Sequence, residues 1–182
     1  MNILLHLCCG PCASFPLPFL KNEGHDVSGI FYNPNIHPYI EYEKRRAAAR
    51  TLADKHGMVL IVDEDYNPTP YLQNIAFQEQ QRCKICHQLR MEKVAQIASE
   101  EGFDAFTTSL LVSPYQKHDL IKQVGEECGA KYDVQFLYHD WRPHYRDTIR
   151  ISKELGLYRQ PYCGCIYSEW ERYGKNRWEE HA

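Results

Sequence analysis

Short apolar segments alternate with longer segments of helical composition along the whole chain, and this alternation limits the possible folds. The apolar segments have the length and composition of buried strands, and the segments between them carry helix formers and helix stop signals. Strands that alternate with helices are typical of a mainly parallel sheet covered by helices on both faces. The sequence therefore predicts an α/β, Rossmann-like protein. We expect strands at residues 2–7, 26–32, 58–63, 103–111 and 132–137.

The helices are expected in the segments between these strands. Pro16 is tolerated only near the start of the first helix, and Gly57 is a stop signal for the second. Gly129 is expected to end the helix that precedes the last strand. The predicted helices span residues 14–22, 39–57, 71–81, 84–101, 116–128, 144–155 and 166–173.

The 182 residues are predicted to form one domain, residues 1–182. No apolar run is long enough to cross a membrane, and the first residues lack the pattern of a signal peptide, so we expect a cytoplasmic protein. With a net charge of −3, a polyanionic partner would have to meet a local basic face. The polar tail from Lys175 to Ala182 is expected to fray.

Seven of the eight cysteines fall into three groups. A reducing cytosol disfavours disulfides, and neighbours such as Cys8 and Cys9 have poor geometry for bridging each other. A disulfide framework stays an alternative, because intracellular disulfides persist in some hyperthermophiles. Several thiols in a small volume suit a metal cluster. The three groups are Cys8, Cys9 and Cys12, then Cys83 and Cys86, then Cys163 and Cys165.

The position of each group also favours metal binding. The first group follows the first predicted strand, at the carboxyl end where parallel sheets bind ligands. Cys83 and Cys86 begin a helix, whose N-terminus favours thiolate over thiol. Gly164 lets the backbone fold tightly between the cysteines of the third group. The eighth cysteine, Cys128, is predicted to be an ordinary buried residue.

Seven grouped thiols exceed the four that a structural zinc ion or one iron–sulfur cluster needs. The surplus favours two adjacent metal centres, or one centre beside a redox dithiol. Two alternatives stay open: a thiol–disulfide oxidoreductase that uses Cys83 and Cys86, and a zinc-stabilised RNA-binding module. Nucleotide hydrolysis is disfavoured, because Pro11 and the thiols stand where a phosphate loop would offer backbone amides.

Five segments together resemble the cobalamin-independent epoxyqueuosine reductases, from Leu4 to about Ser168. They are "HLCCGPC", "FYNPNIHPYIEYEKR", "RCKICHQLR", "TTSLLVSPYQKHD" and "SKELGLYRQPYCGCIYS". The resemblance implies the last step of queuosine synthesis in tRNA, in which epoxyqueuosine loses its epoxide oxygen. It also implies a fold similar to the adenine-nucleotide alpha-hydrolase-like domains.

The same resemblance implies a [4Fe-4S] cluster with an adjacent iron ion. Asp140 is expected to complete the coordination of the second iron as a carboxylate ligand. Which thiols serve which centre stays open. The implied cysteine ligands are Cys8, Cys9, Cys83, Cys86, Cys163 and Cys165, with Cys12 as a further candidate metal ligand.

Removal of the epoxide oxygen consumes two electrons and two protons and releases water. An iron with an open position can act on the oxygen as a Lewis acid while the cluster delivers electrons. Asp140 or His6 is predicted to supply protons, with a structural role in the core as the alternative for His6. An external electron donor such as a ferredoxin or flavodoxin is expected, since the cluster cannot store electrons for repeated turnover.

The implied partner is tRNA with epoxyqueuosine in its anticodon loop. Basic residues on two predicted helices and tyrosines beside the motifs are candidate contacts, although both are also common as solvated helix faces and core residues. These candidates are Lys44, Arg45, Arg46, Arg50, Arg146, Arg150, Lys153, Tyr32, Tyr39, Tyr115, Tyr158 and Tyr162.

Overall fold

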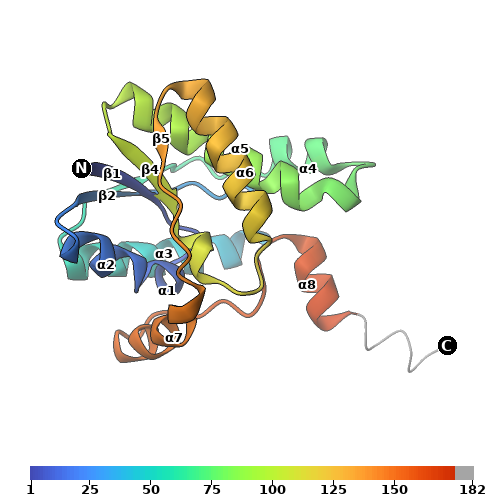
Figure 1. Ribbon diagram of the computed structural model, residues 1–182. Coiled ribbons are helices and arrows are strands. Elements are labelled where there is room, and N and C mark those ends of the chain that lie inside the picture. The colour runs from blue at the N-terminus through green and yellow to red at the C-terminus, as the bar shows by residue number, and fades with distance from the viewer. Residues whose placement is uncertain (175–182) are drawn as a thin grey trace.

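The protein is built on a five-stranded parallel sheet, seen in a computed structural model that describes residues 1–174 (Figure 1). The strand order β3-β2-β1-β4-β5 and the parallel pairing of all neighbours confirm the predicted α/β, Rossmann-like class. The expectation for the tail from Lys175 to Ala182 lies outside the described residues. The strands are β1 Asn2–His6, β2 Asp26–Phe31, β3 Leu60–Val62, β4 Ala105–Thr108 and β5 Gln135–Phe136.

Helices cover both faces of the sheet, and two more lie beyond the carboxyl ends of the strands (Figure 1). One face carries α1 Gly10–Ala13, α2 Pro16–Asn22, α3 Tyr39–His56 and α7 Tyr145–Glu154. The opposite face carries α5 Arg82–Glu100 and α6 His118–Tyr132, while α4 Thr69–Ile75 and α8 Ile166–Tyr173 lie at the carboxyl end. Short 3-10 helices are η1 Glu79–Gln81, η2 Ser109–Val112 and η3 Arg142–His144.

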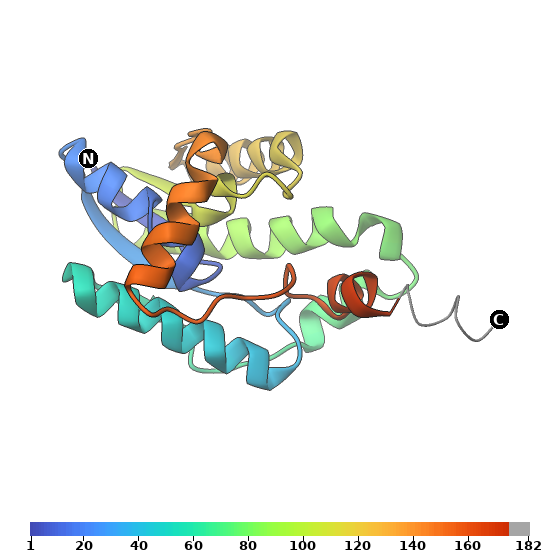
Figure 2. The same ribbon diagram turned by 90° about the horizontal axis from the view of Figure 1, so that it is seen from below.

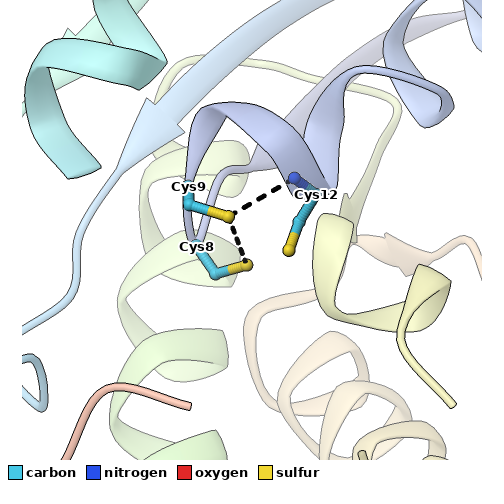
Figure 3. A group of neighbouring side chains, drawn as sticks. All are labelled: Cys8, Cys9 and Cys12. Carbon is cyan, nitrogen blue, oxygen red and sulfur yellow. Dashed lines mark hydrogen bonds between the residues drawn. The ribbon is translucent and has the colours of Figure 1, made fainter. Parts of the chain in front are cut away.

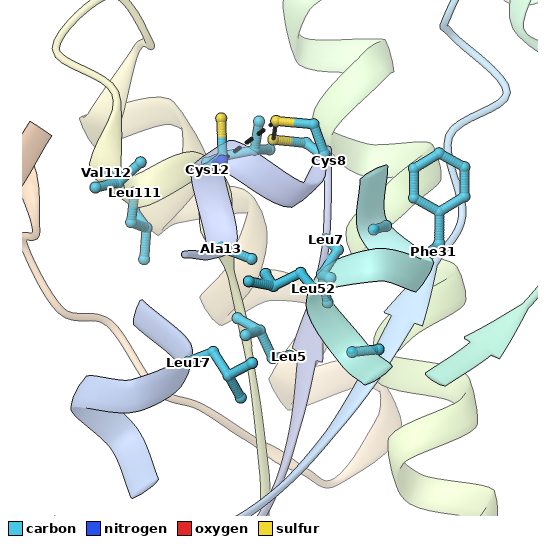
Figure 4. Close-up of a cluster of buried hydrophobic side chains, with 14 of the residues drawn as sticks. Leu5, Leu7, Cys8, Cys12, Ala13, Leu17, Phe31, Leu52, Leu111 and Val112 are labelled. Carbon is cyan, nitrogen blue, oxygen red and sulfur yellow. Dashed lines mark hydrogen bonds between the residues drawn. The ribbon is translucent and has the colours of Figure 1, made fainter. Parts of the chain in front are cut away.

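The core lies on both faces of β1, as expected for a central parallel strand. Leu5 and Leu7 pack with Leu17 and Leu52 on one face, directly below the first group of cysteines (Figure 4). Leu4 packs with residues of α5 and α6 on the other face. The thiols therefore lie above an apolar base at the end of the central strand.

Two predicted boundaries were wrong for identifiable reasons. β4 ends at Thr108, because the Thr108 hydroxyl accepts a hydrogen bond from the Leu110 amide and starts η2. Helix α6 passes through Gly129 and ends at Tyr132 before Asp133, which has φ +51°. A Cβ on Gly129 would lie 2.7 Å from the Val134 carbonyl oxygen, so this glycine permits close packing of the chain that enters β5.

No helix in residues 1–174 is both long enough and apolar enough to span a membrane.

Gly129→Ala tests the packing role of this glycine. Gly→Ala inside a helix ordinarily stabilises by about 1 kcal/mol. Here the added methyl group meets a backbone oxygen, so we expect the free energy of unfolding to fall by about 1–3 kcal/mol. Urea unfolding of both proteins at equal metal loading measures it, and a stabilised variant would contradict the packing role.

Candidate metal centre

The sulfur atoms of Cys8, Cys9 and Cys12 converge at the end of β1 (Figure 3). Their Sγ atoms all lie within 4.8 Å of one another, and those of Cys8 and Cys9 are 3.8 Å apart. Two thiolates on one tetrahedral ion with bonds of about 2.3 Å lie about 3.8 Å apart. Within residues 1–174, no other set of three His, Cys, Asp or Glu side chains is gathered this closely. This cysteine triad fits a metal ion.

Helix α1 creates the triad. The predicted start of the first helix at residue 14 was wrong, since a helical turn already forms at Gly10 and a second helix follows from Pro16. Cys9 is the N-cap, and its Sγ accepts a hydrogen bond from the Cys12 amide at 3.3 Å. A Cβ on Gly10 would lie 2.4 Å from the Ala48 carbonyl oxygen, so only glycine lets α1 pack this closely on α3.

The three buried thiols cannot all ionise without a cation beside them. Hydrogen bonds with Cys12 and Cys9 hold the pKa of Cys8 well below its ordinary value. Burial raises the pKa of Cys9 well above its ordinary value, and the contact with Cys8 does the same to the pKa of Cys12. Ionisation of one thiol therefore opposes ionisation of the other two, and a metal ion would displace their protons.

A second set of thiols gathers where α5 begins and the chain enters α8. Cys86 and Cys165 are buried in an apolar cluster with Tyr71, Cys83 is half-buried and Cys163 is exposed. Burial raises the pKa of Cys86 to about 12, and the nearby charges of Cys163, Cys165 and Cys83 add to this shift. The structure thus brings the second and third cysteine groups of the sequence together.

Arg90 is a buried cation associated with both sets of thiols. It is 2% exposed, and it donates to the Cys86 carbonyl oxygen at 3.1 Å and to Cys86 Sγ at 3.1 Å. In residues 1–174, no carboxylate lies within 4.0 Å of its guanidinium. Burial acts to lower the pKa of Arg90, but the charges of Cys86, Cys163 and Cys8 outweigh it. The counter-charge of Arg90 must therefore come from sulfur.

Arg45 fixes the segment between α7 and α8 to α3. This segment runs between α3 and α5 (Figure 2). Arg45 is 1% exposed, pairs with buried Glu41 at 2.7 Å, and donates to the carbonyl oxygens of Tyr162 and Cys163. The Tyr158 hydroxyl donates to the other Glu41 oxygen. The suggestion that Arg45 belongs to a basic surface stripe was therefore wrong.

Two glutamines and one glycine also contact the thiols and the segment between α7 and α8. The side-chain amide of Gln160 donates to Cys12 Sγ at 3.1 Å, and that of Gln116 donates to Cys163 Sγ at 3.3 Å. Gly164 has φ +142°, and a Cβ there would lie 3.1 Å from Arg45 Nη1, which explains the tight backbone expected at this position. Arg90 and both glutamines were not predicted from the sequence. Arg90 and Gln160 lie close to cysteine motifs in the chain, whereas Gln116 does not.

His6 and Asp140 form hydrogen bonds with residues other than the cysteines of the triad. His6 is fully buried, with Nδ1 2.9 Å from Thr108 Oγ1 and Nε2 3.1 Å from the Tyr32 carbonyl oxygen. Because a carbonyl only accepts, Nε2 carries the proton, and burial lowers the pKa of His6 to about 4. Asp140 is paired with Arg142, whose hydrogen bonds hold the pKa of that carboxyl at about 2.

Cys128 is buried in the core between the sheet and helices α5 and α6, as predicted.

Residues 3–171 match the family model described as epoxyqueuosine reductase QueH. The chain belongs to the QueH family. A QueH protein of Dehalococcoides mccartyi is 40% identical over 174 residues, which cover 96% of each chain. The QueH protein of Thermotoga maritima is 34% identical over 185 residues, covering 96% of this chain and 94% of the relative. These matches confirm the family that the sequence resembles.

A solved structure described as a predicted subunit of tRNA methyltransferase, from Methanocaldococcus jannaschii, shares the fold. It aligns with a TM-score of 0.57 and 13% identity, over 85% of this QueH chain and 76% of the other. Membership in a family of epoxyqueuosine reductases confirms that the chain is an oxidoreductase enzyme. It does not support the zinc-stabilised RNA-binding module or the thiol–disulfide oxidoreductase.

Arg45→Leu tests the buried ion pair. The substitution leaves Glu41 charged and buried without its partner, so we expect a loss of about 3–5 kcal/mol in the free energy of unfolding. Arg50→Leu on the same helix is the control, since its exposed pair with Glu64 contributes no more than about 1 kcal/mol. Equal losses in urea unfolding would show that the Arg45 contacts add little.

Proposed function

We propose that this protein reduces epoxyqueuosine in tRNA to queuosine, with a [4Fe-4S] cluster and an adjacent iron held by cysteines. The observation that carries the proposal is the buried Arg90, which has thiols rather than a carboxylate as its anionic neighbours. A metal–thiolate centre supplies negative charge that free thiols with raised pKa values do not. The family membership names the substrate.

The residues present fit such a group. The 3.8 Å spacing of Cys8 and Cys9 suits two ligands of one ion, and Cys12 lies close enough to join them. The remaining candidate ligands are Cys83, Cys86, Cys163 and Cys165. When bound, the cluster and adjacent iron would supply two electrons and a Lewis acid for the epoxide oxygen.

The protein contributes hydrogen bonds to the sulfurs. Ser109 Oγ lies 3.4 Å from Cys8 Sγ, and the amides of Gln160 and Gln116 donate to one thiol of each set. Such donors stabilise a thiolate and raise the reduction potential of a metal bound to it. These contacts favour acceptance of electrons from an external donor such as a ferredoxin or flavodoxin.

Asp140 and His6 are the proposed proton donors, and their surroundings differ. Neutral His6 donates its Nε2 proton to the Tyr32 carbonyl oxygen, which favours a role in fixing the end of β1 beside Cys8. Asp140 is half-exposed, so its carboxylate can receive a proton from solvent, but Arg142 keeps it ionised at neutral pH. Asp140 also stays the proposed carboxylate ligand of the adjacent iron.

Turnover tests the proposed function. An anticodon stem–loop RNA that carries epoxyqueuosine is incubated anaerobically with iron-loaded protein and dithionite, and the nucleosides are separated after digestion. We expect queuosine from the iron-loaded wild type and from Cys128→Ala, but not from Cys9→Ala or zinc-loaded wild type. Failure of the iron-loaded wild type, with iron and sulfide present, would overturn the proposal.

Arg90→Met tests the charge balance. In metal-loaded protein the substitution removes the cation beside an anionic centre, so we expect the free energy of unfolding to fall by about 3–5 kcal/mol. In metal-free protein Arg90 has no full counter-charge, and the loss should stay below about 1.5 kcal/mol. Anaerobic urea unfolding of both forms measures the difference.

Arg90→Lys is the matched control for this experiment, because it keeps the positive charge and should recover part of the loss. Equal losses for Arg90→Met with and without metal would show that the guanidinium serves packing and hydrogen bonding alone.

Asp140→Asn tests the proton donor. If Asp140 becomes protonated when substrate is bound, despite its pairing with Arg142 in the free protein, kcat of the variant falls at least about 100-fold, the usual contribution of a general acid. If Asp140 acts only on protons, iron and sulfide contents stay unchanged, whereas loss of iron would identify it as a ligand. An unchanged kcat with full metal content would leave the carboxylate with its ion pair to Arg142 and no part in the reaction.

A further inference from the structure

Tyr115 is an exposed aromatic side chain held on an ordered turn between η2 and α6. It is 82% exposed, yet its amide donates to Ser113 Oγ at 3.3 Å, and the next amide donates to the Ser113 carbonyl oxygen at 3.2 Å. The His118 ring also contacts that carbonyl oxygen, at 3.1 Å. The fold therefore fixes the position of a ring that contributes little to the core.

The ring of Tyr115 rests edge-on against Tyr145, with centroids 5.8 Å apart and planes at 84°. We name this pair the Tyr115–Tyr145 ledge. It adjoins both sets of thiols. Gln116, the residue after Tyr115, donates to Cys163 Sγ. Tyr145 begins α7, and α7 packs against α1, which carries Cys12 of the triad. The Ser14 hydroxyl at the end of α1 donates to the Thr148 carbonyl oxygen of α7 at 3.4 Å.

Three cations without carboxylate partners lie near the Tyr115–Tyr145 ledge. Lys117, Arg146 and Arg159 are exposed, and in the part of the chain that the structure describes none lies within 4.0 Å of a carboxylate. Lys117 and Arg146 follow the two tyrosines in the chain, and Arg159 precedes Gln160, whose side-chain amide donates to Cys12 Sγ. Positive charge is thus available beside the thiols despite the net charge of −3.

Several of the other basic candidates are already paired. Arg46 and Arg50 on α3 both bind Glu64, and Arg150 on α7 binds Glu154. The hydroxyls of Tyr158 and Tyr162 are similarly engaged, with Glu41 and the His37 carbonyl oxygen. The Tyr115–Tyr145 ledge, in contrast, combines an exposed aromatic ring with cations that have no carboxylate within 4.0 Å in the described residues.

We propose that Tyr115 is a stacking platform for an unpaired RNA base next to the reacting nucleotide, while Lys117, Arg146 and Arg159 contact the flanking phosphates. The inference rests on the proposed function, because it takes the substrate to be an RNA loop. Proteins read RNA loops by stacking unpaired bases on aromatic side chains, and exposed cations bind the backbone. Tyr145 packs edge-to-face with Tyr115 and keeps the Tyr115 ring next to the thiols.

The test measures binding of a labelled anticodon stem–loop RNA, without the modified base, to iron-loaded protein. Tyr115→Leu keeps an apolar side chain but removes the aromatic face, so we expect Kd to rise about 5- to 100-fold. Tyr115→Phe keeps the face and should bind within about twofold of the wild type. Both variants should retain wild-type iron and sulfide contents, because the ring contacts no thiol directly.

Turnover of epoxyqueuosine RNA is measured with the same proteins, so that the two proposals are separated. If the wild type binds and turns over the RNA and Tyr115→Leu binds it equally well, the platform is overturned. A Tyr115→Leu variant that keeps its RNA Kd but needs more of a protein electron donor would also overturn it, since the ledge would then bind that donor. Binding that depends on Tyr115 without any turnover by the wild type would support the ledge and overturn the proposed function.

Discussion

The structure depends on the balance of charge between buried sulfurs and buried guanidinium groups. Arg45 is neutralised by Glu41 and orders the segment that carries Cys163. Arg90 has no carboxylate within 4.0 Å in residues 1–174, and its nearest anionic groups are thiols. Burying a guanidinium without a counter-charge is costly, so the thiols around Arg90 must carry negative charge in the working protein.

The parallel sheet explains how cysteines from distant parts of the sequence meet. β1 ends at the triad, α5 begins at Cys83, and the segment before α8 passes between α3 and α5. In a nucleotide-binding protein of similar architecture, the turn after the first strand would offer backbone amides to phosphate. Here the same position has three thiols and Pro11, and Gly10 lets the turn pack directly on α3.

Much of this arrangement could be predicted from the sequence, because strand alternation and cysteine grouping are local signals. The parallel sheet, α8 at residues 166–173 and the core position of Cys128 all followed from composition and spacing. The wrong end predicted for β4 has a local cause, the hydrogen bond from the Leu110 amide to the Thr108 hydroxyl, whereas the error at Gly129 comes from tertiary contact. Gly129 has the appearance of a helix stop, but it lies inside α6 because the chain entering β5 packs against it.

The buried arginines could not be identified from their surroundings in the sequence. Arg45 lies in a run of basic residues with Arg46, and only the fold shows that Arg45 is fully buried while Arg46 is partly buried and paired with Glu64. Arg90 lies within the motif "RCKICHQLR" and carries no sequence signal that separates it from an exposed helix residue. The division of seven thiols into a triad and a second set likewise depends on helix α1. The prolines of that segment led to the prediction that the first helix begins only at residue 14.

The proposed function requires that these thiols hold an anionic iron–sulfur centre. The most direct measurement is the content of iron, zinc and acid-labile sulfide per chain after anaerobic purification, together with the absorption spectrum. A [4Fe-4S] cluster with an adjacent iron would give about five irons and about four sulfides per chain, with visible absorption from the cluster. Zinc without sulfide would contradict it and leave the protein without a source of electrons for the reduction.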